Sequence, residues 1–319
     1  MTDTSASSSA NEPVGPLADR LAALAHLFAV PIRDQAILTT AGVSFSQEAI
    51  PSEDDLAADH YRILSHDVMP DAGVFLEDDG MLGGSLAQHV YAWMTAQGFA
   101  PDDTTRSTGH MVNELGFMAH LLRTGAPDEA AAFWHRHAAG WMPLVMLHLQ
   151  RSESAWFEAL GSGLAKALGE IVALAPSTYD ASNLIPASLA GADLDLNEGR
   201  VGLARIGAFL AVPARSGLVL SRSRLSQLGR AFRLPTGFGS RARIVEGLLR
   251  SGAQYDGWTA ICDALIEECD TTRASWSSAP DAEQWKRQWF ERLAFTRATL
   301  ERMRDAEDDE NIGDHSSDS

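Results

Sequence analysis

The sequence is short of the features that mark secreted and membrane-spanning chains. Its 319 residues include only two cysteines, Cys262 and Cys269. Seven residues apart on one helix, they would lie about 10 Å apart along the axis, too far for a disulfide, so we expect two reduced thiols. No apolar run approaches the roughly 18 residues of a membrane-spanning helix. Residues 1–13 have neither a basic start nor an apolar middle, which argues against a secretory signal. Together these absences predict a cytoplasmic protein.

The sequence also lacks the common catalytic and metal-binding motifs. It has no nucleophile elbow, no phosphate-binding loop and no dinucleotide fingerprint. There are ten histidines, but none stands in the Glu-x-x-His pair that a dimetal helical bundle requires. His110 and Glu114 lie one helical turn apart, which offers two ligands at most, and we expect a local hydrogen bond between them. The sequence therefore offers no reason to propose an enzyme or a permanently bound metal or cofactor.

Basic residues are few relative to acidic ones. The chain has 43 acidic and 25 basic residues, a net charge of -18, which disfavours attraction to nucleic acid or an anionic membrane over most of the molecule and favours basic partners. Ten of the acids lie between Glu48 and Asp79, where Arg62 is the only arginine. Two interpretations are open: a solvated acidic loop, or a segment in which some acids face a cleft for a basic peptide.

Helical periodicity runs through the chain, and no alternating strand pattern competes with it. A first helix is predicted from Leu17 to just before Pro31, and Ser85 is expected to cap another that ends near Gly98. The stretch from Gly109 to Leu149 predicts three helices, separated at Gly125 and before Pro143. Methionine and leucine recur there on one stripe, formed by Met111, Leu115, Met118 and Leu122.

These patterns predict an all-α fold in several parts. Residues 1–16 should be disordered, 17–176 a helical domain, 177–198 a linker, 199–304 a second helical segment and 305–319 an acidic disordered tail. The expected helices of the second segment span residues 201–212, 221–232, 240–251, 258–269 and 282–303.

The central stretch also resembles a known family. The order His110, Glu114-Leu115-x-Phe117-Met118 and Phe133-x-x-x-His137-x-x-x-Trp141-x-Pro143 is similar to the signature of the TorD/DmsD/NarJ proteins, which are cytoplasmic chaperones for molybdenum-containing redox enzymes. His60-Tyr61-Arg62-Ile63-Leu64 looks like the Tyr-x-x-Leu element of that family. The resemblance implies a TorD-like helical bundle over residues 17–176. It also implies a chaperone that binds an apo-enzyme of the DMSO reductase type, or its twin-arginine signal peptide, until the cofactor is inserted.

Candidate peptide-binding residues follow from the resemblance and from the apolar stripe. The resemblance points to Tyr61, His110 and Glu114, and we add Met118 because methionines suit a groove that accepts variable apolar side chains. Trp141 and Pro143 match family positions that we expect to be structural. One departure stands out, because the family's Pro-x-Asp-His element is replaced by Ser107-Thr108-Gly109-His110. Either an acidic contact comes from elsewhere, or the client peptide differs.

Arginine is concentrated in the second half. Eight arginines and one acid, Glu246, lie between residues 215 and 250. Arg215, Arg222 and Arg241 are candidates for docking against the acidic segment, or for contacts to the phosphates of a molybdopterin cofactor or a guanine nucleotide held transiently. Residues 221–230 also resemble the opening of a helix-turn-helix, although Pro235, Gly237 and Gly239 stand where a recognition helix would follow. The alternative function is thus a helical regulatory or nucleic-acid-binding protein.

Overall fold

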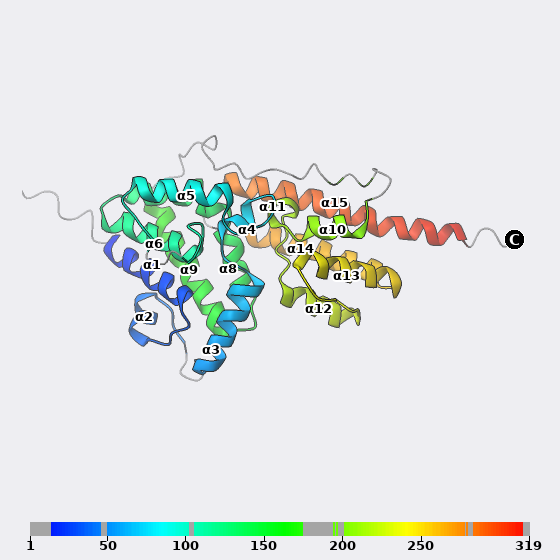
Figure 1. Ribbon diagram of the computed structural model, residues 1–319, viewed down its shortest axis with the longest axis horizontal. Coiled ribbons are helices and arrows are strands. Elements are labelled where there is room, and N and C mark those ends of the chain that lie inside the picture. Colours follow the sequence, from blue (N-terminus) through cyan, green and yellow to red (C-terminus); the bar gives the residue numbers. More distant parts are fainter. Residues whose placement is uncertain are drawn as a thin grey trace, which may run out of the picture.

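A computed structural model of the protein confirms the predicted all-α fold. It describes residues 14–45, 50–101, 105–174, 194, 196, 201–277, 279 and 283–314, and every regular element within these ranges is a helix. Figure 1 shows an elongated arrangement of helices, with the N-terminal ones gathered at one end and the long last helix running toward the other. None of the described helices combines the length and apolar character needed to cross a lipid bilayer.

The helices fall into an N-terminal unit (residues 14–174) and a C-terminal unit (residues 201–314). The first contains α1 (Val14–Ala29), α2 (Gln35–Thr40), α3 (Glu53–His60), the π-helix η2 (Tyr61–Asp67), α4 (Ala72–Leu76), α5 (Gly84–Ala96), α6 (Met111–Arg123), α7 (Pro127–Arg136), the 3-10 helix η3 (Ala138–Gly140), α8 (Met142–Gln150) and α9 (Ala155–Leu174). The second contains α10 (Leu203–Leu210), α11 (Pro213–Ser216), α12 (Arg222–Phe232), α13 (Arg241–Gln254), α14 (Trp258–Ser277) and α15 (Glu283–Asp314).

The central stretch folds as its local signals predicted. Helix α6 ends just before Gly125, which has a φ of +77°, a value that glycine adopts without strain. Pro127 is the first residue of α7, and Pro143 lies in the first turn of α8. The stripe of Met111, Leu115, Met118 and Leu122 is buried in the N-terminal core.

The acidic segment is helical rather than a loop in most of its described part, although Glu53, Asp54 and Asp55 are exposed to solvent. Glu77, Asp78 and Asp79 lie in the turn after its last helix, and Glu48 lies outside the described residues. The segment forms α3, η2 and α4. Three of its acids occupy the first turn of α3, where the helix dipole favours negative charge, and the hydroxyl of Ser52 accepts the N–H of Asp55. Asp71 caps α4 by accepting the N–H of Gly73 at 2.9 Å. Several acids therefore start helices.

The start of α5 corrects a second prediction. Its N-cap is Gly83, and Ser85 lies within the helix. A carboxylate oxygen of Glu77 accepts the N–H of Leu86 at 2.7 Å and the hydroxyl of Ser85 at 3.1 Å. A side chain from the preceding loop thus satisfies a free N–H of the first turn.

The two units share their hydrophobic packing, which the predicted domain boundary did not anticipate. Trp276, Trp285 and Trp289, from α14 and α15, belong to the core of the N-terminal unit. The indole N–H of Trp285 donates to the carbonyl of His135 at 2.9 Å, and that of Trp289 donates to the carbonyl of Gly140 at 2.8 Å. Further along α15, Leu293, Leu300 and Met303 pack in a second core made by the C-terminal unit. Helix α15 therefore joins both cores.

The predicted ends and linker are only partly within the described residues. Helix α1 begins at Val14, so residues 14–16 are helical, whereas residues 1–13 lie outside the described part. Helix α15 continues to Asp314, past Asp305, where the expected acidic tail begins. Of the predicted linker 177–198, only Leu194 and Leu196 are described, and Leu194 is buried in the second core.

Candidate functional site

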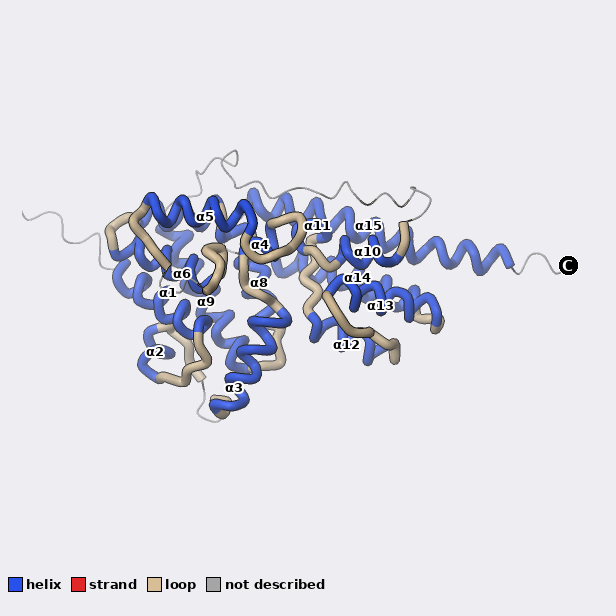
Figure 2. The backbone as a smooth tube through the Cα atoms, in the orientation of Figure 1, coloured by secondary structure: helices blue, strands red, loops and turns tan. Residues whose placement is uncertain are grey.

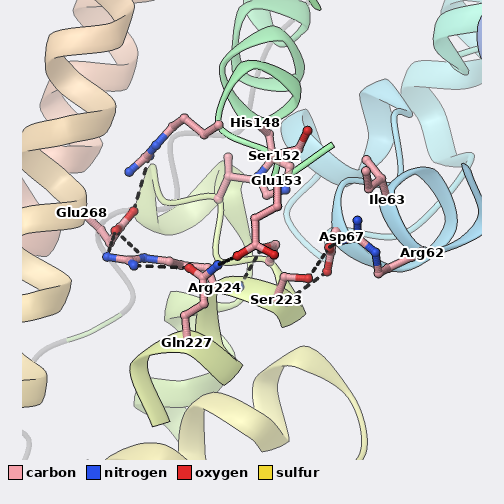
Figure 3. Close-up of a pocket in the computed structure, with 13 residues that line it drawn as sticks. Arg62, Ile63, Asp67, His148, Ser152, Glu153, Ser223, Arg224, Gln227 and Glu268 are labelled. Carbon is pink, nitrogen blue, oxygen red and sulfur yellow. Dashed lines mark hydrogen bonds and ion pairs between the residues drawn. The ribbon is translucent and has the colours of Figure 1, made fainter. Parts of the chain in front are cut away.

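A polar cavity lies where the two units meet. It has a volume of about 270 Å³ and combines side chains from η2, from the end of α8, from α12 and from α14. Figure 3 shows them converging from these elements. The charged and polar lining residues are Arg62, Asp67, His148, Arg151, Ser152, Glu153, Ser221, Ser223, Arg224, Gln227 and Glu268. We call this cavity the interunit pocket.

Asp67 is the acid through which η2 joins the C-terminal unit. Its carboxylate accepts the N–H of Ser223 at 3.0 Å and the hydroxyl of Ser223 at 2.5 Å. Ser223 lies in the first turn of α12, whose unpaired N–H groups favour a negative charge. Arg62 lies 3.7 Å from the same carboxylate, and Arg241 donates to the Asp67 carbonyl at 3.2 Å. The π-helix that presents Asp67 is a rare conformation, often found at functional sites.

Two further acids of the interunit pocket differ in how fully they are paired. Glu268, largely buried, accepts Arg224 through Nε at 2.7 Å and through Nη2 at 2.5 Å, and Arg151 lies 3.6 Å away. Glu153 is exposed and accepts the amide of Gln227 at 3.1 Å. The pocket therefore contains one carboxylate that already binds a guanidinium group, Glu268, and one that is open to solvent, Glu153.

The remaining titratable group of the pocket is held neutral. Burial is the main reason that the pKa of His148 falls from 6.5 to about 4, and the charges of Arg241, Arg151 and Arg62 act in the same direction. Burial, followed by the charge of Arg222, lowers the pKa of Arg241. At neutral pH the pocket thus presents carboxylates, guanidinium groups, hydroxyls and a neutral imidazole.

This set of groups suits recognition by charge-assisted hydrogen bonds. Among the described residues, no three or more histidine, cysteine or acidic side chains are placed to hold a metal ion. The pocket volume lies below the roughly 300–1,000 Å³ of typical small-molecule sites. It therefore fits one or two side chains of a peptide better than a large cofactor.

The predicted site residues His110 and Glu114 lie near a buried cluster elsewhere in the N-terminal unit. Glu114 and His137 are fully buried, and their side chains meet at 2.6 Å. The expected local hydrogen bond between His110 and Glu114 forms through the backbone, where the N–H of Glu114 donates to the carbonyl of His110 at 3.1 Å. The side chain of His110 caps α6, with Nδ1 accepting the N–H of Val112 at 3.2 Å. Its backbone also pairs with Asp71.

Burial controls the protonation of this cluster. It raises the pKa of Glu114 from 4.5 to about 7, with the nearby charge of Asp71 adding to the effect and His137 opposing it. Burial likewise raises the pKa of Asp71. The Glu114–His137 pair links α6 to the end of α7. Because neither side chain has exposed surface, a ligand from solvent cannot reach the pair.

The other two predicted peptide-binding residues, Met118 and Tyr61, differ in their exposure to solvent. Met118 is fully buried in the N-terminal core. Tyr61 is 63% exposed, packs edge-on against His66 with ring centroids 4.6 Å apart, and precedes Arg62 of the interunit pocket. The structure therefore does not bring Tyr61, His110, Glu114 and Met118 into one open groove.

Most of the clustered arginines are used within the chain. Arg215 donates to the carbonyl of Asp78 at 2.7 Å, and Arg241 donates to that of Asp67, so both contact the acidic segment through its backbone. Arg224 holds Glu268, while Arg243 and Arg250 hold Glu246. Arg222 begins α12 near Arg241.

Sequence reasoning missed most of the interunit pocket. Asp67 and Arg224 lay inside the acidic and arginine-rich segments that the sequence singled out. No comparable signal marked Glu153, His148 or Glu268, because an isolated charge on a helix looks like any solvated residue. No family model, curated protein or solved structure matches the chain.

Proposed function

We propose that this protein is a non-enzymatic chaperone for a molybdenum-containing oxidoreductase of the DMSO reductase type. It would bind the apo-enzyme or its twin-arginine signal peptide until the cofactor is inserted. The sequence resemblance supplies the client class. The structural observation that supports binding of a basic peptide is the interunit pocket, in which carboxylates already hold guanidinium groups.

The peptide site in this proposal is the interunit pocket, because Glu114 and Met118 are buried. Glu153 is open to solvent and paired with a neutral amide, so an incoming arginine can replace Gln227 without breaking an ion pair. A second arginine would compete with Arg224 for Glu268, and the two contacts that Glu268 Oε1 already makes to the Arg224 guanidinium support this step. In this proposal the carboxylates of the interunit pocket supply the acidic contact that the family's aspartate before His110 would otherwise provide.

Peptide binding to the full-length protein tests this proposal. A labelled peptide with two adjacent arginines before an apolar stretch is titrated and followed by fluorescence anisotropy. We expect the same peptide with two lysines to bind more weakly, because lysine cannot make the two-point contact of a guanidinium. Glu153→Gln should weaken the arginine peptide about fivefold. Glu158→Gln, an exposed acid on α9 outside the pocket, is the matched control.

Cellular co-purification identifies the client. The tagged protein should carry with it a molybdoenzyme catalytic subunit, and Glu153→Gln should reduce the recovered amount. Recovery of no such subunit under conditions where molybdoenzymes are made would contradict the client class. Equal peptide affinity for the wild type and Glu153→Gln would instead contradict the site.

A further inference from the structure

The loop between α12 and α13, residues 233–240, exposes an unusual apolar side chain. Phe238 is 99% exposed, more than any other large hydrophobic residue in the described part of the chain. It stands between Gly237 and Gly239, whose φ angles are +70° and +120°. Figure 2 shows this loop as the tan segment that runs between α12 and α13. The ring therefore contacts almost nothing within the protein.

Exposed arginines flank this loop. Arg230 lies in the last turn of α12 and Arg233 directly follows that helix. Arg243 lies in the first turn of α13, and its side chain is 69% exposed. Arg250, further along α13, is 67% exposed. The only acid among residues 230–250 is Glu246, which is largely buried and held by the two α13 arginines.

We propose that this surface, formed by Phe238, Arg230, Arg233, Arg243 and Arg250, docks on a membrane rich in anionic lipids. Here we call it the Phe238 surface. The ring would enter the region between head groups and acyl chains, and the guanidinium groups would bind lipid phosphates. This docking does not depend on the chaperone function, because the Phe238 surface shares no residue with the interunit pocket.

The exposure of Phe238 favours a lipid surface over nucleic acid. A stacked base covers one face of an aromatic ring, whereas a lipid interface surrounds the whole side chain. Since nearly all of Phe238 is exposed, insertion removes more apolar surface from water than stacking does. The net charge of -18 also matters, because the acidic remainder of the molecule is repelled by anionic lipids and turns this basic edge toward them.

Vesicle sedimentation with the full-length protein tests the proposal. The protein should bind vesicles of phosphatidylcholine mixed with phosphatidylserine and should not bind vesicles of phosphatidylcholine alone. Phe238→Ser should lower the partition coefficient about tenfold, because the apolar insertion is lost. Arg230→Gln combined with Arg233→Gln should lower it by at least a similar factor. Tyr255→Ser, which removes another exposed aromatic from the same unit, should leave it unchanged.

A fluorescent probe reports insertion directly. Cys262 and Cys269 are buried, so Phe238→Cys offers a single accessible thiol for an environment-sensitive dye. Emission should rise on addition of the mixed vesicles and stay constant with phosphatidylcholine alone. The proposal is overturned if the wild type does not sediment with the mixed vesicles, or if Phe238→Ser binds them equally well. Binding of a single-stranded oligonucleotide that depends on Phe238, without vesicle binding, would assign the surface to nucleic acid instead.

Discussion

The Asp67 carboxylate and Ser223 are joined by two hydrogen bonds, of 3.0 Å to the backbone N–H and 2.5 Å to the hydroxyl. Asp67 is 2% exposed, so both bonds form away from bulk water. They connect η2 of the N-terminal unit to the amino end of α12 in the C-terminal unit. One side chain therefore binds the first turn of α12 and fastens the two units together.

Replacing Asp67 should loosen this connection. Asp67→Ala leaves the N–H of Ser223 without its acceptor and removes the negative charge from the α12 N-terminus. We expect the free energy of unfolding to fall by about 2 kcal/mol. Urea denaturation measures this loss, and hydrogen exchange should show faster exchange in the first turn of α12. Asp54→Ala, an exposed acid on α3, should change the free energy by less than about 0.5 kcal/mol. Equal losses in both variants would deny Asp67 this role.

Glu114 should make stability fall as pH rises. Its pKa is higher in the folded protein, about 7, than its usual 4.5, so the folded state holds the proton more tightly. The stabilisation is fully present below pH 4.5 and is lost as pH rises to about 7. Relative to Glu114→Gln, the wild type should lose up to about 3 kcal/mol over this range. Denaturation at a series of pH values measures the difference, and parallel profiles for the two proteins would refute it.

His148 should act in the opposite direction. Its pKa is lowered from 6.5 to about 4 in the folded protein, so the folded state disfavours the charged imidazole. The stabilisation is present above pH 6.5 and is lost as pH falls toward 4. The free energy of unfolding of His148→Gln should therefore decrease less than that of the wild type as pH falls from 6.5 toward 4. The same pH series measures it, with His89→Gln on the exposed face of α5 as control. A wild-type acid slope retained in His148→Gln would count against burial of the ring.

Gly140 should tolerate no side chain. A Cβ atom there would lie 2.9 Å from the indole ring of Trp285, which the core holds in place. Gly140→Ala should lower the free energy of unfolding by about 1–3 kcal/mol, as overpacking does. Gly169→Ala is the matched control, since a Cβ in that part of α9 meets nothing within 4 Å and alanine favours a helix. In thermal denaturation, the melting temperature of Gly140→Ala should fall and that of Gly169→Ala should rise relative to the wild type. An unchanged melting temperature for Gly140→Ala would show that α15 can shift to make room for the added methyl group.

The helices were predictable where their signals are local. Pro127 begins α7 and Pro143 lies in the first turn of α8, and the expected helices 221–232 and 240–251 begin at the residues that cap α12 and α13. Each of these signals acts within one helical turn. The interpretation of the acidic segment as a solvated loop missed its short helices, because they contain few apolar residues among many charges. The cap of α5 was missed because Glu77 reaches the helix from outside it.

The candidate site was far less predictable. Periodicity placed Met118 on an apolar stripe, but it could not distinguish an open groove from a closed core. The spacing of His110 and Glu114 suggested a local hydrogen bond, and one forms through the backbone, but the spacing could not show that the side chain of Glu114 meets His137, the residue that follows α7. Contacts across the expected linker were not predictable for a similar reason, because Trp285 and Trp289 lie beyond it in the chain and still pack in the first core.

The sequence by itself determined an all-α protein with most of its helix starts and an uneven distribution of charge, because these properties depend on neighbouring residues and on composition. Only the tertiary structure decided which charges meet. Arg224 faces Glu268, and Asp67 faces Ser223, because the packing of α14 and α15 into both cores sets the position of the C-terminal unit. Contacts between residues so distant in the chain depend on the packing of the whole molecule.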